Sequence, residues 1–134
     1  MALDFAGSDA AYAAKAVKVS KIYGEGDATV RALDSVSVGF PSGRFTAIMG
    51  PSGSGKSTLM HCLAGLDTVT SGNVFLGKTD LSSLDDKALT LLRRDQVGFI
   101  FQAFNLLPTL TALENITLPS TWPAGNPTRR GSTR

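Results

Sequence analysis

The sequence has 134 residues, 43% of them apolar, which suits one globular domain or part of a larger one and excludes wholesale disorder. A formal net charge of +2 is too small to imply binding to nucleic acid or to a membrane surface. The single cysteine, Cys62, excludes an internal disulfide framework and fits a reducing compartment, and no apolar run approaches the ~18 residues that cross a bilayer. The N-terminus carries Asp4 and Asp9 and has no basic stretch followed by an apolar core, so we expect a cytosolic domain without a signal peptide.

The first forty residues predict a leader followed by two strands. Residues 1–15 contain six alanines, two aspartates and one serine and are expected to form a flexible leader. Residues 17–22 predict a strand with apolar positions at Val17, Val19 and Ile22. After a turn at residues 24–27, residues 30–40 predict a second strand region, whose apolar face is formed by Val36, Val38 and Phe40.

The middle of the chain alternates strand and helix patterns. Residues 45–49 form a nearly continuous apolar run, as expected for a strand that is buried on both faces. A glycine-rich segment follows at once, and residues 57–64 predict a helix that ends before Gly65. Residues 72–77 predict a short strand between glycines.

Two further helices and one strand are predicted beyond residue 80. Residues 84–94 predict a helix with acidic residues near its start and arginines at its end, where these charges complement the helix dipole. Residues 97–101 predict another buried strand. Thr111 opens a last short helix, and Glu114 three residues later gives the spacing of a capping box.

The last sixteen residues differ in character from the rest. Residues 119–134 have no acidic residue and no periodicity, and we expect them to be irregular. Residues 1–118 carry ten basic and eleven acidic side chains, so the positive charge of the chain belongs wholly to this tail.

The glycine-rich segment matches the pattern G-x-x-x-x-G-K-[ST]. It consists of Gly50, Pro51, Ser52, Gly53, Ser54, Gly55, Lys56 and Ser57, and Thr58 follows. Small residues let the backbone curl so that its N–H groups point at phosphate oxygens, and the following helix directs the positive end of its dipole at the same anion. We therefore name residues 50–58 the phosphate loop.

Each polar side chain at the end of the phosphate loop has an expected role. Lys56 is expected to reach the β- and γ-phosphates, the Ser57 hydroxyl to coordinate Mg²⁺, and Thr58 to add contacts on the α-phosphate side. The alternative is a plain turn with a surface lysine. A buried strand before the loop and a helix after it favour nucleotide binding.

At this point the sequence resembles the ATP-binding cassette (ABC) ATPases, over residues 17–118. The runs that carry the resemblance are, in chain order, Lys21-Ile22-Tyr23-Gly24, Ala32-Leu33-Asp34-Ser35-Val36-Ser37, the phosphate loop, Leu63-Ala64-Gly65-Leu66-Asp67, Thr70-Ser71-Gly72-Asn73-Val74 and the stretch from Val97 to Pro108. That last stretch, with Thr111 to Ile116, looks most like the branch that serves lipoprotein release and macrolide export.

The resemblance implies roles for residues outside the phosphate loop. Tyr23 matches an aromatic residue that stacks on the adenine ring; surface packing is the alternative for a tyrosine that ends a strand, and its position upstream of the phosphate loop favours stacking. Gln102 matches a glutamine that contacts Mg²⁺ and the attacking water, so Lys56 and Gln102 are the expected catalytic residues. Residues 103–114 would lie against a membrane subunit. In that position the apolar side chains of Phe104, Leu106 and Leu107 would form an exposed interface patch. Packing of the same side chains into the core is an equal alternative.

The resemblance also implies a fold, a location and partners. Residues 16–118 would form the N-terminal part of an α/β phosphate-loop NTPase domain with an N-terminal antiparallel β-subdomain. The implied activity is ATP hydrolysis with Mg²⁺, coupled to export through transmembrane permease subunits. The full-length form would be a homodimer on the inner face of the cell membrane, with no nucleic acid as partner.

Several motifs of that family are absent from these 134 residues. There is no Leu-Ser-Gly-Gly-Gln-like signature, no four-residue apolar run ending in Asp-Glu, and no switch histidine after a further strand. Without them hydrolysis would lack its general base and the electrostatic contribution of a second monomer. The hypothesis is a truncated ATPase whose residues 119–134 arise from a frameshift near residues 119–121, which the nucleotide sequence of the gene can test.

Two other functions compete with this interpretation. A small phosphate-loop kinase would place the loop near its N-terminus, whereas 49 residues precede Gly50 here. The other alternative is a non-catalytic nucleotide-binding stub or pseudogene product. Simple structural roles are expected for His61 (packing), Cys62 (a small buried hydrophobe), and Arg93 with Arg94 (a helix C-terminal pair).

Overall fold

The computed structural model describes residues 12–101 and 105–121. The chain divides into two units, Met1–Val97 and Gly98–Arg134. The first unit contains the strands β1 (Tyr12–Tyr23), β2 (Val30–Pro41), β3 (Ser71–Leu76) and β4 (Thr79–Asp80), the short 3-10 helices η1 (Gly26–Ala28) and η2 (Leu81–Ser83), and the helices α1 (Lys56–Leu63) and α2 (Asp86–Gln96). The second unit contains α3 (Ala112–Thr121).

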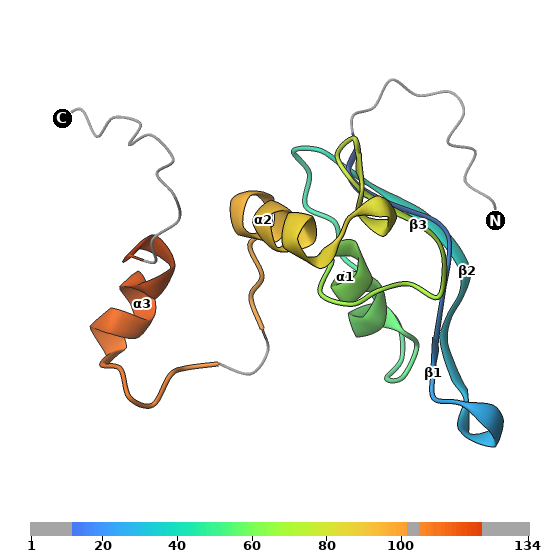
Figure 1. Cartoon of the computed structure of the whole chain (residues 1–134), viewed down its shortest axis with the longest axis horizontal. Helices are drawn as coiled ribbons and strands as arrows, with labels where there is room; N and C mark the ends of the chain where they lie inside the picture. The colour runs from blue at the N-terminus through green and yellow to red at the C-terminus, as the bar shows by residue number, and fades with distance from the viewer. Residues whose placement is uncertain (1–11, 102–104, 122–134) are drawn as a thin grey trace. The chain divides into compact units, whose positions relative to one another are not determined.

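The four strands form one antiparallel sheet in the order β2-β1-β3-β4. The first two strands are joined by a short connection that includes η1, and the third strand pairs on the other side of β1 (Figure 1). This confirms the expected N-terminal antiparallel β-subdomain. It also begins earlier than expected, because β1 starts at Tyr12 and so includes residues 12–15 of the predicted leader.

Helix α1 lies against the sheet and closes the core of the first unit (Figure 1). The buried side chains of this core are Ala16, Val19, Leu33, Leu59, Cys62, Leu63, Val74 and Leu81. The predicted apolar face of the second strand is confirmed, because Val36, Val38 and Phe40 pack against this core. From α2, Leu89 and Leu92 pack against it too.

A bulge in β1 changes which of its residues face inward. Lys18 has a left-handed backbone (φ 49°), and the pairing register of β1 shifts around it. As a result Ala16 and Val19 are both fully buried, although they are three positions apart, and Val17 and Ile22 are only half-buried. The simple apolar face expected at Val17, Val19 and Ile22 is therefore wrong.

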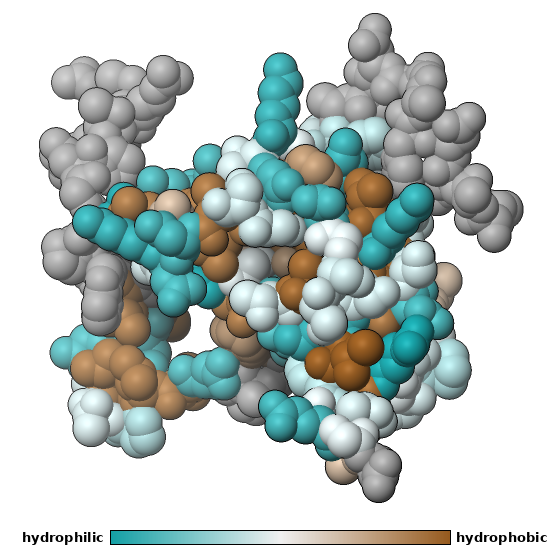
Figure 2. All heavy atoms as spheres, turned by 45° about the vertical axis from the view of Figure 1, so that its right-hand side comes forward, coloured by the Kyte–Doolittle hydropathy of each residue, from teal (hydrophilic) through white to brown (hydrophobic). Residues whose placement is uncertain are grey.

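Neither of the two strands predicted to be buried on both faces forms. Residues 45–49 and 97–101 have no regular structure and pair with no strand among the described residues. Phe45 and Ile100 are almost fully exposed, and Figure 2 shows apolar side chains lying at the surface among hydrophilic ones. A strand of a parallel sheet needs neighbours for its N–H and C=O groups, and no such neighbour is present in the described part of the chain.

The predicted helices are confirmed with small shifts. The helix after the phosphate loop ends at Leu63 and is followed by Gly65 with a left-handed backbone, and the third predicted helix begins after Thr111. That helix continues across Pro119 to Thr121, three residues into the tail expected to be irregular. In the described ranges, no helix has the length and apolar character that a membrane crossing requires.

Candidate functional site

The phosphate loop connects the exposed segment before it to the N-terminus of α1. Gly53 (φ 77°) and Gly55 (φ 82°) both adopt left-handed backbones, and Gly55 is the N-cap residue of the helix. A methyl group on Gly55 would overlap the carbonyl oxygen of Ala32 on β2. Glycine is therefore required there both by backbone conformation and by the close approach of the two elements.

Lys56 folds back over the loop that precedes it. Its Nζ donates hydrogen bonds to the carbonyl oxygen of Pro51 at 2.6 Å and to Oγ of Ser54 at 3.3 Å. Both acceptors are uncharged, and no carboxylate pairs with Lys56 in the part of the chain that the structure describes. The ammonium group therefore keeps its charge available for an anion held by the loop.

A cavity of about 280 Å³ opens beside the loop. Residues 52–58 line one side of it, and Val30, Arg31 and Ala32 of β2 line the other. This volume is near the lower end of ordinary small-ligand sites, which hold about 300–1,000 Å³. Curled glycines, an uncompensated lysine and the N-terminus of a helix make the cavity chemically suited to phosphate groups.

The residues present also suit a magnesium ion that arrives with a polyphosphate. The Ser57 side chain is exposed at the start of α1, and its hydroxyl is the kind of oxygen ligand that Mg²⁺ takes together with substrate phosphates. Within residues 12–101 and 105–121, no group of three His, Cys, Asp or Glu side chains could hold a metal by itself. The second expected ligand, Gln102, lies outside the described residues.

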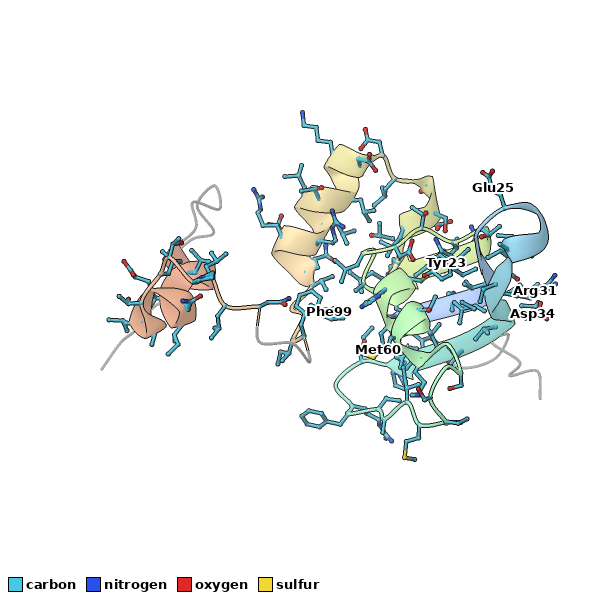
Figure 3. The ribbon with its side chains drawn as sticks, turned by 90° about the horizontal axis from the view of Figure 1, so that it is seen from below. Tyr23, Glu25, Arg31, Asp34, Met60 and Phe99 are labelled. Atoms are coloured by element: carbon cyan, nitrogen blue, oxygen red, sulfur yellow. The ribbon has the colours of Figure 1, made fainter. Side chains whose placement is uncertain are left out.

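Tyr23 ends β1 directly across from Val30 of β2, one of the residues that line the loop cavity. Figure 3 shows it beside α1, and its hydroxyl donates a hydrogen bond to Oδ2 of Asp67 at 2.6 Å. Its side chain is half-exposed and is not itself part of the cavity lining. Tyr23 is therefore next to the loop but is held by a residue outside it.

Two charged residues around Tyr23 have no role in the sequence interpretation. Lys21, two positions earlier on β1, is buried and donates to Oδ1 of Asp67 at 2.7 Å and to the carbonyl oxygen of Thr68 at 2.6 Å. Its ammonium also lies 4.8 Å from the centre of the Tyr23 ring. Lys21 and Asp67 are 46 positions apart, so only the tertiary structure pairs them.

These contacts change the acidity of both acidic groups. The bond to Asp67 and, after it, burial raise the pKa of Tyr23, although the Thr58 hydroxyl acts in the opposite direction on the same side chain. Burial raises the pKa of Asp67, but the hydrogen bonds from Lys21 and Tyr23 outweigh it and leave the pKa below its ordinary value. Asp67 is therefore a carboxylate at neutral pH and accepts bonds from both partners.

The residues expected to have simple roles are placed as follows. Cys62 is buried in the core, and burial raises the pKa of its thiol, so it is a packing residue. Arg93 and Arg94 do lie in the last turn of α2, and Arg93 also donates from Nη1 to the carbonyl oxygen of Gly65 at 3.0 Å. His61 lies on α1. A second cavity, of about 250 Å³, lies between the end of α1, β3, η2 and α2.

The second unit contains part of the segment expected to face a membrane subunit. Leu106 and Leu107 are exposed there, and Phe104 lies outside the described residues. The Asn115 side chain of α3 accepts from the N–H of Leu107 at 2.9 Å and donates to the carbonyl oxygens of Leu107 and Leu110 at 3.2 Å each. Asn115 thus fixes the shape of the loop that exposes both leucines.

Comparison with known proteins points to one family. Residues 33–133 match the family model described as ABC transporter, so the match extends past residue 118 into the tail. The chain is 48% identical over 105 residues to the ABC transporter ATP-binding protein MJ0796 of Methanocaldococcus jannaschii. This alignment covers 78% of this chain and 45% of that protein.

Two further relatives have names that state a transport role. The macrolide export ATP-binding/permease protein MacB of Hyphomonas neptunium is 48% identical, over 78% of this chain and 16% of that protein. The lipoprotein-releasing system ATP-binding protein LolD of Legionella pneumophila is 47% identical, over 76% of this chain and 45% of that protein. The chain thus spans about half the length of MJ0796 and of LolD, and less of MacB.

A solved structure supports the fold. The dimeric, post-hydrolysis form of the MJ0796 cassette bound to ADP and Pi superposes with a TM-score of 0.78 at 43% identity. The alignment covers 86% of this chain and 50% of that one. The described residues therefore adopt part of the same cassette fold, with the antiparallel sheet as its subdomain.

Proposed function

This chain belongs to the ABC transporter family of ATP-binding proteins, and on that premise we propose that it binds ATP and Mg²⁺ at the phosphate loop. The observation that carries the proposal is the loop itself. Two left-handed glycines, a lysine without a carboxylate partner and a helix N-terminus surround one cavity of about 280 Å³. Family membership disfavours the alternative of a small kinase.

The proposed contacts follow from the chemistry of each group. Backbone N–H groups of the loop would hold the phosphate oxygens, and the Lys56 ammonium would exchange its bonds to Pro51 and Ser54 for bonds to the β- and γ-phosphates. The Ser57 hydroxyl would coordinate Mg²⁺, and Thr58 would contact the α-phosphate side. Tyr23 would offer its ring to the adenine.

For the whole protein we propose ATP-driven export through transmembrane permease subunits, with two ATP-binding subunits acting together at the inner face of the membrane. The support comes from the relatives, since MacB is named for macrolide export and LolD for lipoprotein release, and the MJ0796 cassette is described as dimeric. Gln102 is the proposed contact to Mg²⁺ and to the attacking water. Residues 103–114 are proposed to face the permease, and in the described part of that segment Leu106 and Leu107 are exposed for the contact.

Turnover by these 134 residues is expected to be weak or absent. They contain no signature motif and no aspartate–glutamate pair after an apolar run, so the general base is missing. Binding does not need those groups. The proposed activity of this chain is therefore nucleotide binding with little hydrolysis.

The test measures ATP binding and ATP turnover on the purified chain and on Lys56→Ala. Loss of the ammonium should weaken binding about tenfold or more, because charge-assisted hydrogen bonds contribute about 1.5–3 kcal/mol each. Lys87→Ala is the matched control, since it removes the same charge from an exposed position on α2 and should leave binding unchanged. Equal affinity in the Lys56 and Lys87 variants would contradict the proposal, and steady turnover that disappears only in Lys56→Ala would contradict the weak-hydrolysis part.

A further inference from the structure

A buried cation on β1 fixes the position of a carboxylate that follows α1. Only 9% of Lys21 is exposed, and lysine is rarely buried without a partner. Its ammonium donates to Oδ1 of Asp67 and to the carbonyl oxygen of Thr68. The Thr68 N–H donates to the same carboxylate oxygen at 2.8 Å, so the orientation of the Asp67 side chain is set from two directions.

The other oxygen of that carboxylate holds Tyr23. Oδ2 of Asp67 accepts from the Tyr23 hydroxyl, while the Lys21 ammonium lies 4.8 Å from the ring centre. Lys21 and Tyr23 are two positions apart on β1 and so point to the same face of the sheet. One carboxylate therefore binds both side chains, and the Tyr23 ring is restrained at its hydroxyl and on its face.

The restrained ring lies beside the phosphate loop. The hydroxyl of Thr58, the last residue of that loop, lies close enough to the Tyr23 side chain to act on its pKa, which it lowers against the larger effect of Asp67. Across the strand pair, Tyr23 is opposite Val30, which lines the loop cavity. Tyr23 is still 41% exposed, which leaves room for a planar group to pack on its ring.

We propose that Asp67, oriented by Lys21, is a positioning residue that fixes the Tyr23 ring next to the phosphate loop as a platform for the base of the bound nucleotide. This inference rests on the proposed nucleotide binding. A ring that is already fixed loses less conformational freedom when the base packs on it, so the gain appears in the affinity for nucleotides. It does not appear in the affinity for phosphate groups alone, because the loop holds those without Tyr23.

A purely structural role for the cluster makes a different prediction. The bonds from Lys21 to Asp67 and Thr68 connect β1 to the chain after α1 whether or not Tyr23 takes part. Tyr23→Phe removes only the hydroxyl and keeps both the ring and those bonds. Asp67→Asn keeps the shape of the side chain but replaces the oxygen that accepts from Tyr23 with an NH₂ group, because the donors Lys21 and Thr68 hold the other oxygen.

The experiment measures the affinity of the full 134-residue chain for two probes, ATP and inorganic tripolyphosphate, each with Mg²⁺. Tyr23→Phe and Asp67→Asn should each weaken ATP binding about two- to tenfold and leave tripolyphosphate binding unchanged. The double variant should bind ATP with the same affinity as whichever single variant binds it less tightly, because both substitutions remove the bond from the Tyr23 hydroxyl to Asp67. Tyr12→Phe, which removes a hydroxyl at the far end of β1, should change neither affinity.

Each other result has a definite meaning. Unchanged ATP affinity in Tyr23→Phe would overturn the inference, also if Asp67→Asn proves too unstable to measure. An equal loss for ATP and tripolyphosphate would overturn it as well, because the cluster would then only support the loop. Lys56→Ala should weaken both probes, and if it weakens neither, or if the unsubstituted chain binds neither, the proposed nucleotide binding itself fails together with this inference.

Discussion

Gly55 joins the phosphate loop to α1 and touches β2, so one missing side chain satisfies two constraints. Its backbone is left-handed, and the carbonyl oxygen of Ala32 occupies the space where a Cβ would lie. Gly53 in the same loop has a similar backbone but no atom within 4 Å of a Cβ position. A comparison of substitutions at the two glycines therefore separates the effect of a left-handed backbone from the effect of steric overlap with Ala32.

Gly55→Ala should lower the free energy of unfolding by about 2 kcal/mol or more, and Gly53→Ala by about 1 kcal/mol. Both variants pay for a left-handed alanine, and only the first also displaces β2 from the start of the helix. Urea unfolding of the two variants and the unsubstituted chain measures the difference. Equal destabilisation would show that the close approach to Ala32 does not matter.

The burial of a polar side chain does not by itself identify the residue that it binds. Lys21 lies in an alternating strand pattern in which its neighbours on the same face are Val19 and Tyr23, so its position predicts an inward-facing side chain. That pattern was the available signal. The sequence could not identify Asp67 as its partner, because nothing local relates positions 46 residues apart.

Among the secondary-structure elements, α3 begins with reciprocal capping bonds. The N–H of Glu114 donates to Oγ1 of Thr111 at 3.3 Å, and the N–H of Thr111 donates to Oε2 of Glu114 at 2.8 Å. The latter bond and the one from the Thr111 hydroxyl lower the pKa of Glu114. The capping box predicted from the spacing of these two residues is therefore confirmed.

Thr111→Ala should destabilise α3 by about 1 kcal/mol, because it removes the side-chain acceptor at the N-cap. Backbone chemical shifts of residues 112–118 report the loss as reduced helicity. Glu114→Gln is the control, since it keeps an acceptor oxygen and should have a smaller effect. A loss as large in Glu114→Gln as in Thr111→Ala would mean that helicity depends on the charge of Glu114 and not on the capping bonds.

The two missing strands differ from these elements in what they need. The antiparallel strands β1 and β2 are joined by a short connection and pair with each other. The capped helices form most of their backbone hydrogen bonds internally. A strand at residues 45–49 or 97–101 can be satisfied only by other strands beside it, and the described residues supply none. The apolar runs were correctly recognised as strand-like, but a sequence pattern cannot report whether a partner is present.

For the molecule as a whole, exposed apolar side chains predict self-association. Phe45, Met49 and Ile100 are each at least 87% exposed, and a soluble protein seldom presents such groups without a partner surface. The purified chain should therefore bind a hydrophobic dye and form concentration-dependent oligomers by size-exclusion chromatography with light scattering. Phe45→Ser and Ile100→Ser should reduce both signals.

Lys87→Ser serves as the comparison for those variants, because it changes an exposed polar side chain on α2 and should alter neither signal. A monomeric chain that binds no dye at high concentration would contradict the prediction. The chain spans about half the length of MJ0796 and LolD. Dye binding by this chain can therefore be compared directly with dye binding by a longer protein of the family.

The sequence by itself determined the phosphate loop and the helices, because a motif, a period or a cap is encoded within a few neighbouring positions, and through its resemblance to a family it also indicated the antiparallel sheet. Only the tertiary structure decided that a bulge at Lys18 turns Ala16 inward, that Lys21 and Tyr23 share Asp67, and that residues 45–49 and 97–101 form no strands. These features depend on contacts between distant segments. Such contacts form only when the partner segment is present and its backbone or side chain can pair with the group on the first segment.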